Sequence, residues 1–577
     1  MISLFHINKF KVFLLSTTLI TSFNIIAFAN KSFLHDPMNA GKYNHHNSKQ
    51  EKHKPLVHTK SLKEYTYNAT KVDMHKIHIK RVELVEEGSS VLPADVQAVH
   101  AILSSFVGSL ASASTMNRLT TKITRYYQDH GQLLAFAYVP TQSFDKGVVK
   151  INVIKGSIRD VIVKGDDGDI DSPVFNEYID KILELNPVTK DELVRYLLLI
   201  NKIPGYEIAY SFEPIPMDKI NPENGKIADL VLAVKRTHAK VIANIDNYGA
   251  SDLGRNQGSL GGQVLSPFNK DESIIGFVGT TNKPSKLKVA TFGYKKIINS
   301  ESTSVQFLGS YITNSANATG VHSNKNDIAT LARASISHYP VLSHKTSLKL
   351  ESGLKHNTQE VYNGAAKQSK YHVLSAFVGT EIQHSDALDG FSSFTPMIYK
   401  GISGASEVTM YDPTLKKYNP SFTLVNGNFW REQPLIGPMS FFFGANGQYS
   451  ADELPLDDKF VVGGLFNARG YKSALVSANK GIGVTAEVRF MQNVESAFLS
   501  SVQPYGFYDF TSFPKSQALT NISSLSSVGA GVRLTFAKDI NCSFEIGQPL
   551  RKNVIIDRVE TKNNTRYSFI LHKIFSW

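Results

Sequence analysis

The chain has 577 residues and a formal net charge of +12, and Cys542 is its single cysteine. Its length is too great for one ordinary core, so several domains are expected, and one cysteine excludes both an intrachain disulfide scaffold and a cysteine-based zinc cluster. The positive charge lies in no dense block of lysine and arginine, so it predicts dispersed surface charge and no nucleic-acid partner.

The first 29 residues have the features of a secretory signal peptide. Lys9 and Lys11 precede an apolar run over residues 12–26, and Ala27 and Ala29 supply small residues in A-x-A spacing. Cleavage is therefore expected after Ala29, with export of the mature chain. Beyond this point no apolar run reaches the ~18–20 residues that a membrane-spanning helix needs, so any insertion into a membrane must use strands.

Residues 30–76 form a polar segment that Pro37, Gly41 and Pro55 interrupt. This composition predicts a solvated linker with at most a short helix, because proline and glycine break its best helical stretch. A histidine-rich metal tract is the alternative. Its spacings are irregular and no set of carboxylates or cysteines completes a site, so no metal is expected. The histidines in this segment or just past it are His35, His45, His46, His53, His58, His75 and His78.

Two similar units follow, at residues 77–155 and 156–237. In each, one strand-like run precedes two helical stretches and two further strand-like runs. Such a tandem repeat indicates two copies of one small α+β unit. The first has expected strands at residues 77–84, 133–139 and 148–154 and helices at 93–106 and 116–130; the second has strands at 158–164, 206–212 and 227–235 and helices at 174–185 and 190–200.

Residues 238–577 lose helical periodicity and show short alternating runs separated by turn residues. Sixteen such runs, an even number, predict a closed transmembrane β-barrel of the bacterial outer-membrane type. A soluble sandwich or propeller would explain neither the signal peptide nor the aromatic last run. Short connections alternate with long ones, which places the first strand's start, and so both α+β units, in the periplasm. The expected strands begin at Lys240, Ser259, Ser273, Lys288, Ser304, Ile328, Ser347, Tyr371, Gly390, Pro420, Pro438, Lys480, Pro504, Val528, Cys542 and Tyr567.

One long outer connection contains a glycine-rich stretch, residues 463–471. Glycines suit a tight loop tip, and the arginine among them is either solvated or folded inward onto a carboxylate. On the strands that follow, alternation directs Glu487 and Asp509 toward the barrel interior, where they are candidate partners. The residues singled out in the stretch are Gly463, Gly464, Arg469, Gly470 and Tyr471.

Ordered motifs connect the two α+β units to a known family. The first unit has a tyrosine–glycine turn at residues 126–131 and a proline-x-glutamine segment at 139–142, and the second has the run LLINKIPG at 198–205. These motifs resemble the POTRA domains of two-partner secretion transporters of the outer membrane, the ShlB/FhaC/HecB or TpsB family. The motif residues are Gly131, Pro140, Gln142, Gly156, Asn201, Pro204 and Gly205.

The barrel region carries further motifs of the same family. Residues 245–255 resemble its opening DN-x-G…GR hairpin, and residues 507–511 resemble its F-x-D-x-G, with threonine in place of the last glycine. The resemblance implies that the sixth outer loop folds into the barrel lumen. There Arg469 would meet Asp509, with Glu487 as a second acid nearby.

The resemblance implies an outer-membrane transporter of a Gram-negative bacterium rather than an enzyme. Its periplasmic POTRA domains would recognise an unfolded exoprotein of haemolysin or adhesin type, which the barrel would secrete. The implied partners are a large exoprotein with an N-terminal secretion domain, outer-membrane lipid, and the barrel-assembly machinery. That machinery would read a C-terminal strand signal at Phe575 and Trp577. No cofactor is implied.

Two other functions are weighed against this one. A general outer-membrane protein assembly insertase belongs to the same superfamily, but two POTRA-like units and the run at residues 198–205 argue against it. A passive porin or a surface adhesin would have no use for tandem POTRA units. The exoprotein's identity, its activation, an N-terminal helix that plugs the pore and the oligomeric state are left open by the sequence.

Overall fold

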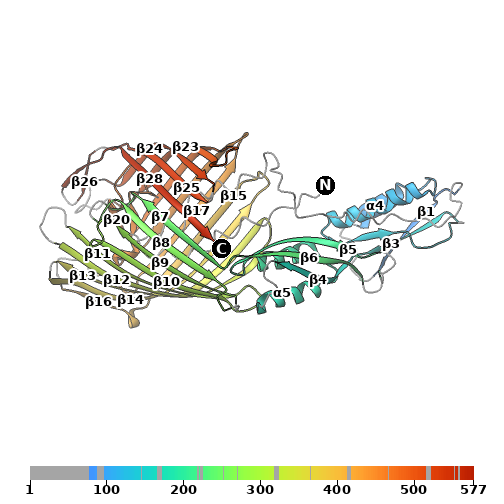
Figure 1. Ribbon diagram of the computed structural model, residues 1–577, viewed down its shortest axis with the longest axis horizontal. Helices are drawn as coiled ribbons and strands as arrows, with labels where there is room; N and C mark the ends of the chain where they lie inside the picture. The colour runs from blue at the N-terminus through green and yellow to red at the C-terminus, as the bar shows by residue number, and fades with distance from the viewer. Residues whose placement is uncertain are drawn as a thin grey trace. The chain divides into compact units, whose positions relative to one another are not determined.

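The computed structural model describes residues 77–577 with short gaps, so the predicted signal peptide and the histidine-rich linker lie outside the described residues. The chain divides into two units with a boundary between Arg236 and Thr237 (Figure 1). The gaps are residues 88–95, 145, 166–171, 217–219, 221–224, 251–252, 269–270, 318–323, 364, 412–417, 466, 515–521, 538, 552 and 557–558.

The first α+β repeat is a three-stranded sheet covered by two helices. Its central strand β3 runs parallel to β1 and antiparallel to β2. Alternation on β3 buries Val149, Ile151 and Val153, which join the apolar side of α4 in one core. The elements are β1 (Arg81–Glu87), α3 (Val96–Ser104), α4 (Ala113–Asp129), β2 (Phe136–Tyr138) and β3 (Val148–Ile154).

Strand β1 begins at Arg81, later than the predicted residue 77. Residues 77–79 bond to the segment after α3 instead of to the sheet. Ile79 N–H donates to the Ser109 carbonyl at 2.9 Å, and Ala111 N–H donates to the Ile77 carbonyl at 2.8 Å. The apolar alternation of the sequence continues from residue 77 into β1. The pattern alone therefore does not show which residues pair with the sheet and which pair with the segment after α3.

The second α+β repeat has the same topology as the first. Strand β6 lies in the centre, parallel to β4 and antiparallel to β5. Backbone bonds join the repeats: Val188 N–H donates to Gly156 O at 2.9 Å, and Lys190 N–H donates to Gly131 O at 2.8 Å. The elements are β4 (Ser157–Gly165), α5 (Pro173–Leu183), α6 (Lys190–Ile200), β5 (Tyr206–Pro214) and β6 (Lys226–Arg236).

The second unit is a closed antiparallel barrel in which β28 pairs with β7. The ring contains eighteen segments, but β15 and β16 both pair with β14, and β21 and β22 both pair with β23. Each of these two pairs fills one position, so eighteen minus two leaves the sixteen strands that were predicted. The segments are β7 (Ala239–Asp246), β8 (Gln257–Leu265), β9 (Glu272–Thr281), β10 (Leu287–Ile297), β11 (Ser304–Asn317), β12 (Asn324–Leu342), β13 (Thr346–Asn363), β14 (Ala366–Ser385), β15 (Phe391–Gly401), β16 (Glu407–Met410), β17 (Thr423–Pro434), β18 (Met439–Tyr449), β21 (Gly481–Phe490), β22 (Gln492–Asn493), β23 (Leu499–Ser512), β24 (Ser524–Phe536), β25 (Ile540–Pro549) and β28 (Arg566–Ser576).

Several strands begin before the predicted residue. Strand β14 begins at Ala366 rather than Tyr371, and β23 begins at Leu499 rather than Pro504. The strand ends are polar and lose the alternating pattern, but their backbone ladders continue. Long connections also contain two small hairpins, β19 (Phe460–Val462) with β20 (Val476–Ala478), and β26 (Asn553–Ile556) with β27 (Val559–Lys562).

The two faces of the barrel wall differ in character. On β23, Tyr508 and Phe510 are exposed on the outside, whereas Phe507 and Asp509, which alternate with them, are buried. β7 begins at the end of the barrel that carries the short connections, and the long connections lie at the other end. In the described part of the chain, none of the helices combines the length and hydropathy needed to cross a bilayer.

Candidate functional site

Loop 6, residues 450–480 between β18 and β21, carries the glycine-rich stretch. The hairpin of β19 and β20 supports its tip. Gly463 and Gly464 have φ values of 90° and 92°, a conformation that glycine adopts without strain. Gly463 N–H donates to the Asn467 carbonyl at 2.7 Å and closes the turn. A Cβ at Gly463 would lie 2.2 Å from the Lys472 carbonyl, so this turn requires glycine.

Arg469 is buried inside the barrel and contacts three carboxylates, which together we call the arginine clasp. Its Nε and Nη2 donate to the two oxygens of Asp509 at 3.0 and 2.9 Å. Its Nη1 donates to Glu487 at 2.7 Å and to Glu545 at 2.9 Å. Only 4% of the residue is exposed, so these bonds form away from bulk water. The rigid guanidinium fork suits such simultaneous bidentate and bridging contacts.

The clasp belongs to a larger charged network on the inner wall. Glu487 also accepts from Arg489 Nε at 2.8 Å and from Arg533 Nη2 at 3.0 Å. Arg489 continues to Glu432, and Arg533 continues to Gln503. Three arginines therefore meet four acids, a formal charge of 3 − 4 = −1 for the set. Such burial is tolerated because each charge is paired.

An aromatic ring lies beneath each of the three guanidinium groups. The guanidinium carbon of Arg469 lies 3.5 Å from the ring centre of Phe507, Arg489 lies 4.0 Å from Phe442, and Arg533 lies 3.8 Å from Tyr505. A planar guanidinium can lie flat on a ring while its edge bonds to several carboxylates, a geometry that the tetrahedral ammonium of lysine does not offer. The site therefore selects arginine by shape as well as by charge.

Gly470 and Tyr471 hold the loop tip against β24 and β25. A Cβ at Gly470 would lie 2.7 Å from the Pro549 nitrogen and 2.8 Å from Ser527 Cβ, so the close approach needs glycine. The Tyr471 hydroxyl donates to the Ser526 carbonyl at 3.1 Å and accepts from Arg551 N–H at 3.0 Å. The two residues after Arg469 thus fix its position along the strands.

Loop 6 has a second attachment, the far anchor, formed by Asp457 and Asp458 near its start. The Lys355 ammonium on β13 bonds to Asp458, and the Tyr371 hydroxyl on β14 donates to Asp457 at 2.8 Å. In the ring of sixteen strands, β13 lies eight positions from β25, the strand that carries Glu545. The far anchor and the arginine clasp therefore attach loop 6 to opposite walls, and the loop crosses the lumen.

The structure brings together the loop and acid residues that were singled out from sequence, but it also adds members. Glu545, Arg533 and the far anchor were missed. Alternation could have found Glu545, because Phe544 and Ile546 beside it are exposed on the outer face while Glu545 is buried. The far anchor had no local signal. It depends on which strands face each other across the closed barrel.

Gln142 and Gly156 have structural roles in the first repeat. Gln142 Nε2 donates to the Lys150 carbonyl at 2.7 Å, and Lys150 N–H donates back to Gln142 Oε1 at 2.7 Å. This amide replaces a neighbouring strand where β2 has ended.

Gly156 has φ 77°, and a Cβ there would lie 2.4 Å from the Leu134 carbonyl. Gly131, at φ 89°, ends the turn after α4 with N–H donation to Gln128 O. Pro140 O accepts from Gln142 Nε2 at 3.4 Å.

Asn201 organises the corresponding turn of the second repeat. It ends α6, donates from Nδ2 to the Leu197 carbonyl at 3.2 Å, and accepts Ile208 N–H at 3.1 Å. Pro204 and Gly205, the latter at φ 88°, complete the turn into β5. The motif therefore supplies hydrogen-bond partners to backbone groups at the helix-to-strand junction.

The C-terminal residues lie at the barrel seam. Phe575 and Trp577 are exposed, with 46% and 63% of their surface accessible. Trp577 N–H donates to the Ala239 carbonyl at 3.2 Å, and its own carbonyl accepts from His238 N–H at 2.8 Å. At the other end of the seam, Asn247 extends the ladder by accepting Phe569 N–H at 2.9 Å. Their part in assembly remains a prediction.

Comparisons with known proteins agree with this architecture. Residues 228–534 match the family described as haemolysin secretion/activation protein ShlB/FhaC/HecB, and residues 77–156 match the POTRA domain of ShlB type. The heme/hemopexin transporter protein HuxB of Haemophilus influenzae is 23% identical over 501 residues, which cover 83% of this chain and 85% of HuxB.

Solved structures show the same fold at low sequence identity. CdiB from Escherichia coli has a TM-score of 0.68 at 16% identity and covers 89% of this chain and 93% of its own. CdiB from Acinetobacter baumannii has a TM-score of 0.60 at 14% identity, with 90% and 94% covered. BamA from Haemophilus ducreyi lacking POTRA domains 1–3 has a TM-score of 0.50 at 11% identity, with 86% and 100% covered.

The matched family region covers more than half of the 577 residues. The chain therefore belongs to the ShlB/FhaC/HecB family of haemolysin secretion/activation proteins, as a two-partner secretion transporter of the outer membrane with POTRA domains in the periplasm.

Proposed function

We propose that the protein secretes one large exoprotein of haemolysin or adhesin type that carries an N-terminal secretion domain. The POTRA domains capture the exoprotein unfolded, and the barrel passes it to the cell surface without enzymatic chemistry. The family match and loop 6 support this proposal. The observation that carries it is the crossing of the lumen by loop 6, because a transporter needs a closed resting state that a static pore does not.

We also propose a division of the described chain into two POTRA domains and a barrel. POTRA 1 covers residues 77–155, POTRA 2 covers residues 156–237, and the barrel covers residues 238–577. The sheet boundary near Gly156 and the unit boundary after Arg236 support these limits. Each POTRA domain then contributes one three-stranded sheet with two edge strands to the capture of exoprotein.

Strand β5 is the proposed capture edge of the second POTRA domain. It lies at the edge of its sheet, with β6 as its neighbour. Ile208 N–H donates to Asn201 rather than to β6, so backbone groups at 208 point away from β6. The period of two then directs the N–H groups of Tyr210 and Phe212 to the same open side. An extended polypeptide can add there as a strand, with little demand on its sequence.

The edge at the end of β2 is the corresponding proposed surface in the first POTRA domain, over residues 138–142. Gln142 already covers the backbone of Lys150 on the central strand. Its amide could be displaced by an incoming strand, which would take over the same two hydrogen bonds. This exchange would retain the number of satisfied backbone groups.

Loop 6 is the proposed gate of the outer step. It is attached to opposite walls, so an exoprotein that passes through the lumen must displace at least one attachment. The far anchor has fewer bonds than the arginine clasp and is the expected first point of release. Outer-membrane transport lacks ATP, so binding steps and folding of the exoprotein outside would supply the direction.

The test uses secretion of an exoprotein encoded beside the transporter, in cells that carry or lack this chain. Secretion that needs the chain supports the proposal, and unchanged secretion without it would overturn it. Tyr210→Pro removes one edge N–H and should lower both secretion and photo-crosslinking of exoprotein to β5. Tyr210→Val retains the N–H and is the matched control. Equal crosslinking in the two variants would reject strand addition while leaving transport intact.

A further inference from the structure

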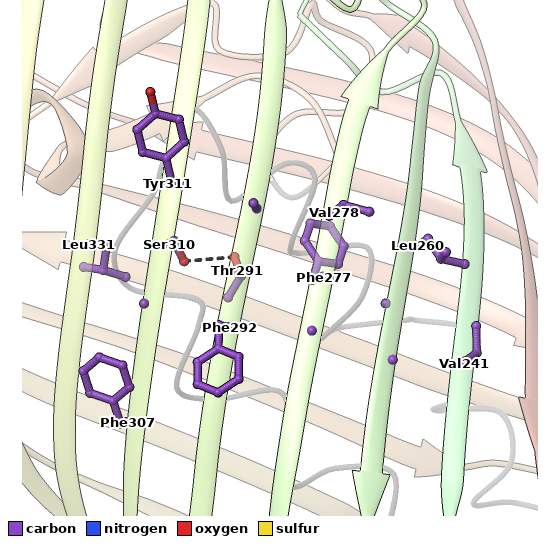
Figure 2. A pocket seen from close by; sticks show the side chains of 15 residues that line it. Val241, Leu260, Phe277, Val278, Thr291, Phe292, Phe307, Ser310, Tyr311 and Leu331 are labelled. Atoms are coloured by element: carbon purple, nitrogen blue, oxygen red, sulfur yellow. Dashed lines mark hydrogen bonds between the residues drawn. The ribbon is translucent and has the colours of Figure 1, made fainter.

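The outer wall of the barrel contains an apolar groove across β7 to β12, with a volume of about 720 Å³ (Figure 2). Strands β7 to β10 lie side by side in the barrel (Figure 1). The groove faces outward, because the side chains at its rim alternate with buried ones that point to the lumen. Phe292 is 52% exposed, for example, whereas Thr291 beside it bonds inward to Ser310 at 2.9 Å. This surface lies in the membrane and is separate from loop 6.

Glycines form the floor of the groove. Gly262 on β8 pairs with Gly276 on β9, and Gly276 pairs with Phe292 on β10, which in turn pairs with Gly309 on β11. One row across four strands thus contains three glycines where bulky side chains would normally cover the wall. Leu260 and the aromatic side chains around this row form the rim.

The barrel itself does not require glycine at the centre of this row. Gly276 has no positive φ, and a Cβ built there would meet no atom within 4 Å. At Gly262 the nearest atom to a Cβ would be Val241 Cγ2, at 3.8 Å. Glycine inside a strand weakens the strand, and it often marks a place where a ligand approaches the backbone. The empty row therefore indicates an occupant outside the wall.

Basic side chains lie at one end of the groove. Residues 273–300 contain no aspartate or glutamate, and their lysines include Lys283, Lys286 and Lys288 at the end that carries the long connections. Lys288 is exposed and lies two residues from Ala290, a groove residue on the same face of β10. Two residues of a strand span roughly 7 Å, so the ammonium can reach a headgroup whose acyl chain lies in the groove.

We propose that this groove binds one lipid of the outer leaflet, a phosphorylated and multiply acylated glycolipid. An acyl chain lies over Gly262 and Gly276, between Leu260 and Phe292, and a phosphate pairs with Lys288 and Lys283. The location of the lysines at the outer end selects the outer leaflet. Charge at one end and apolar surface along the rest match an anionic lipid, whose headgroup and acyl chains have the same arrangement.

The full chain is purified in detergent and delipidated, and one lipid is then added. Native mass spectrometry measures how much of that lipid the chain binds. The probes are diphosphoryl lipid A and phosphatidylethanolamine. Wild type should bind one lipid A in preference to phosphatidylethanolamine. Gly276→Leu fills the groove and should weaken lipid A binding at least about tenfold. This factor corresponds to the lost burial of about two methylene groups of the acyl chain, at ~0.8 kcal/mol each. Lys288→Ala should weaken it about fivefold, which corresponds to ~1 kcal/mol per basic side chain.

The controls separate a built site from general contact with lipid. Gly506→Leu adds the same side chain at another exposed glycine, on β23, where the nearest atom to a Cβ is 3.9 Å away. Lys400→Ala removes an exposed lysine from β15. Both should bind lipid A as wild type does. Equal losses in Gly276→Leu and Gly506→Leu, or equal binding of the two lipids by wild type, would overturn the proposal. Heat-dependent gel mobility identifies folded barrels, and Lys283→Ala with Lys288→Ala tests the site if Gly276→Leu does not fold.

Discussion

Arg469 and Asp509 are joined by three hydrogen bonds, of which one comes from the loop backbone. The Arg469 N–H and Nε both donate to Asp509 Oδ2, at 2.9 and 3.0 Å, and Nη2 donates to Oδ1 at 2.9 Å. Asp509 therefore holds the main chain of loop 6 as well as a side chain. Loss of this carboxylate would release the loop tip even if the charge of Arg469 were satisfied elsewhere.

Arg469→Lys should impair secretion while the barrel still inserts. Lysine cannot reach Asp509, Glu487 and Glu545 together or stack on Phe507. Docking of loop 6 should weaken by roughly 3–5 kcal/mol, because buried carboxylates lose their partner. Protease cleavage within loop 6, compared with folded barrel on a gel, measures the effect. Arg431→Lys, a partly exposed barrel arginine, is the control.

The charge exchange Arg469→Asp with Asp509→Arg should fail to restore docking. Aspartate at position 469 would face Glu487 and Glu545, which now both contact Arg469. Like charges at this distance repel strongly in a buried site. Recovery of secretion by the exchange would show that Asp509 alone determines the contact.

The far anchor should behave as a coupled pair. Lys355→Met and Asp458→Asn each leave one buried charge without its oppositely charged partner. The double variant removes both charges. A double-mutant cycle on loop 6 cleavage should give a coupling of ~1–3 kcal/mol. The arginine clasp should remain closed in all three variants, as shown by unchanged protection near Arg469. Additive effects would exclude direct coupling.

Docking of the far anchor should weaken as pH rises. Burial, opposed by the Tyr371 hydrogen bond and reinforced by Asp458, raises the pKa of Asp457 to about 7. The docked loop therefore holds this proton more tightly than the released loop, whose aspartate has its usual pKa near 4. Its stabilising contribution is complete below about pH 4 and is lost as pH rises through 7.

Loop 6 cleavage between pH 5 and 8 checks this dependence. Wild type should become more sensitive with rising pH, whereas Asp457→Asn should show a flat profile and stay docked at pH 8. Lys355, Asp458, Tyr371 and Asp327 surround the group and are present in both proteins. An unchanged profile in Asp457→Asn would assign the pH effect to one of these neighbours.

Gly470→Ala should release the loop tip without any change of charge. The added methyl would come within 2.7–2.8 Å of Pro549, Gln548 and Ser527, all of which belong to the wall. Secretion and loop protection should fall together, while Gly404→Ala, which meets no atom within 4 Å, should match wild type. Normal protection in Gly470→Ala would show that the tip can shift along the strands.

Asn201→Ala should destabilise the second POTRA domain. It leaves the Ile208 N–H without its acceptor, which costs about 1–3 kcal/mol for a buried group. Denaturant unfolding of the full chain, followed by proteolysis of residues 156–237, measures the loss. Asn176→Ala on the exposed side of α5 should stay within about 0.5 kcal/mol of wild type. Equal stability of the two variants would contradict the structural role of Asn201.

Local patterns in the sequence determined the sixteen strands and the direction of their side chains. The period of two is a property of each strand, so Phe507 and Asp509 could be assigned to one face before any partner was known. The glycines of loop 6 and the arginine among them likewise indicate a tight tip. These predictions needed only neighbours along the chain, and the structure shows the expected strands.

Tertiary structure alone decided which inward side chains meet. Arg469 and Glu545 are 76 residues apart, and Lys355 and Asp458 are 103 apart. Alternation gives the face of a strand but neither its register nor the strand opposite it in the closed ring. The crossing of the lumen by loop 6 follows from that closure, because only the complete ring brings β13 and β25 to opposite ends of one loop.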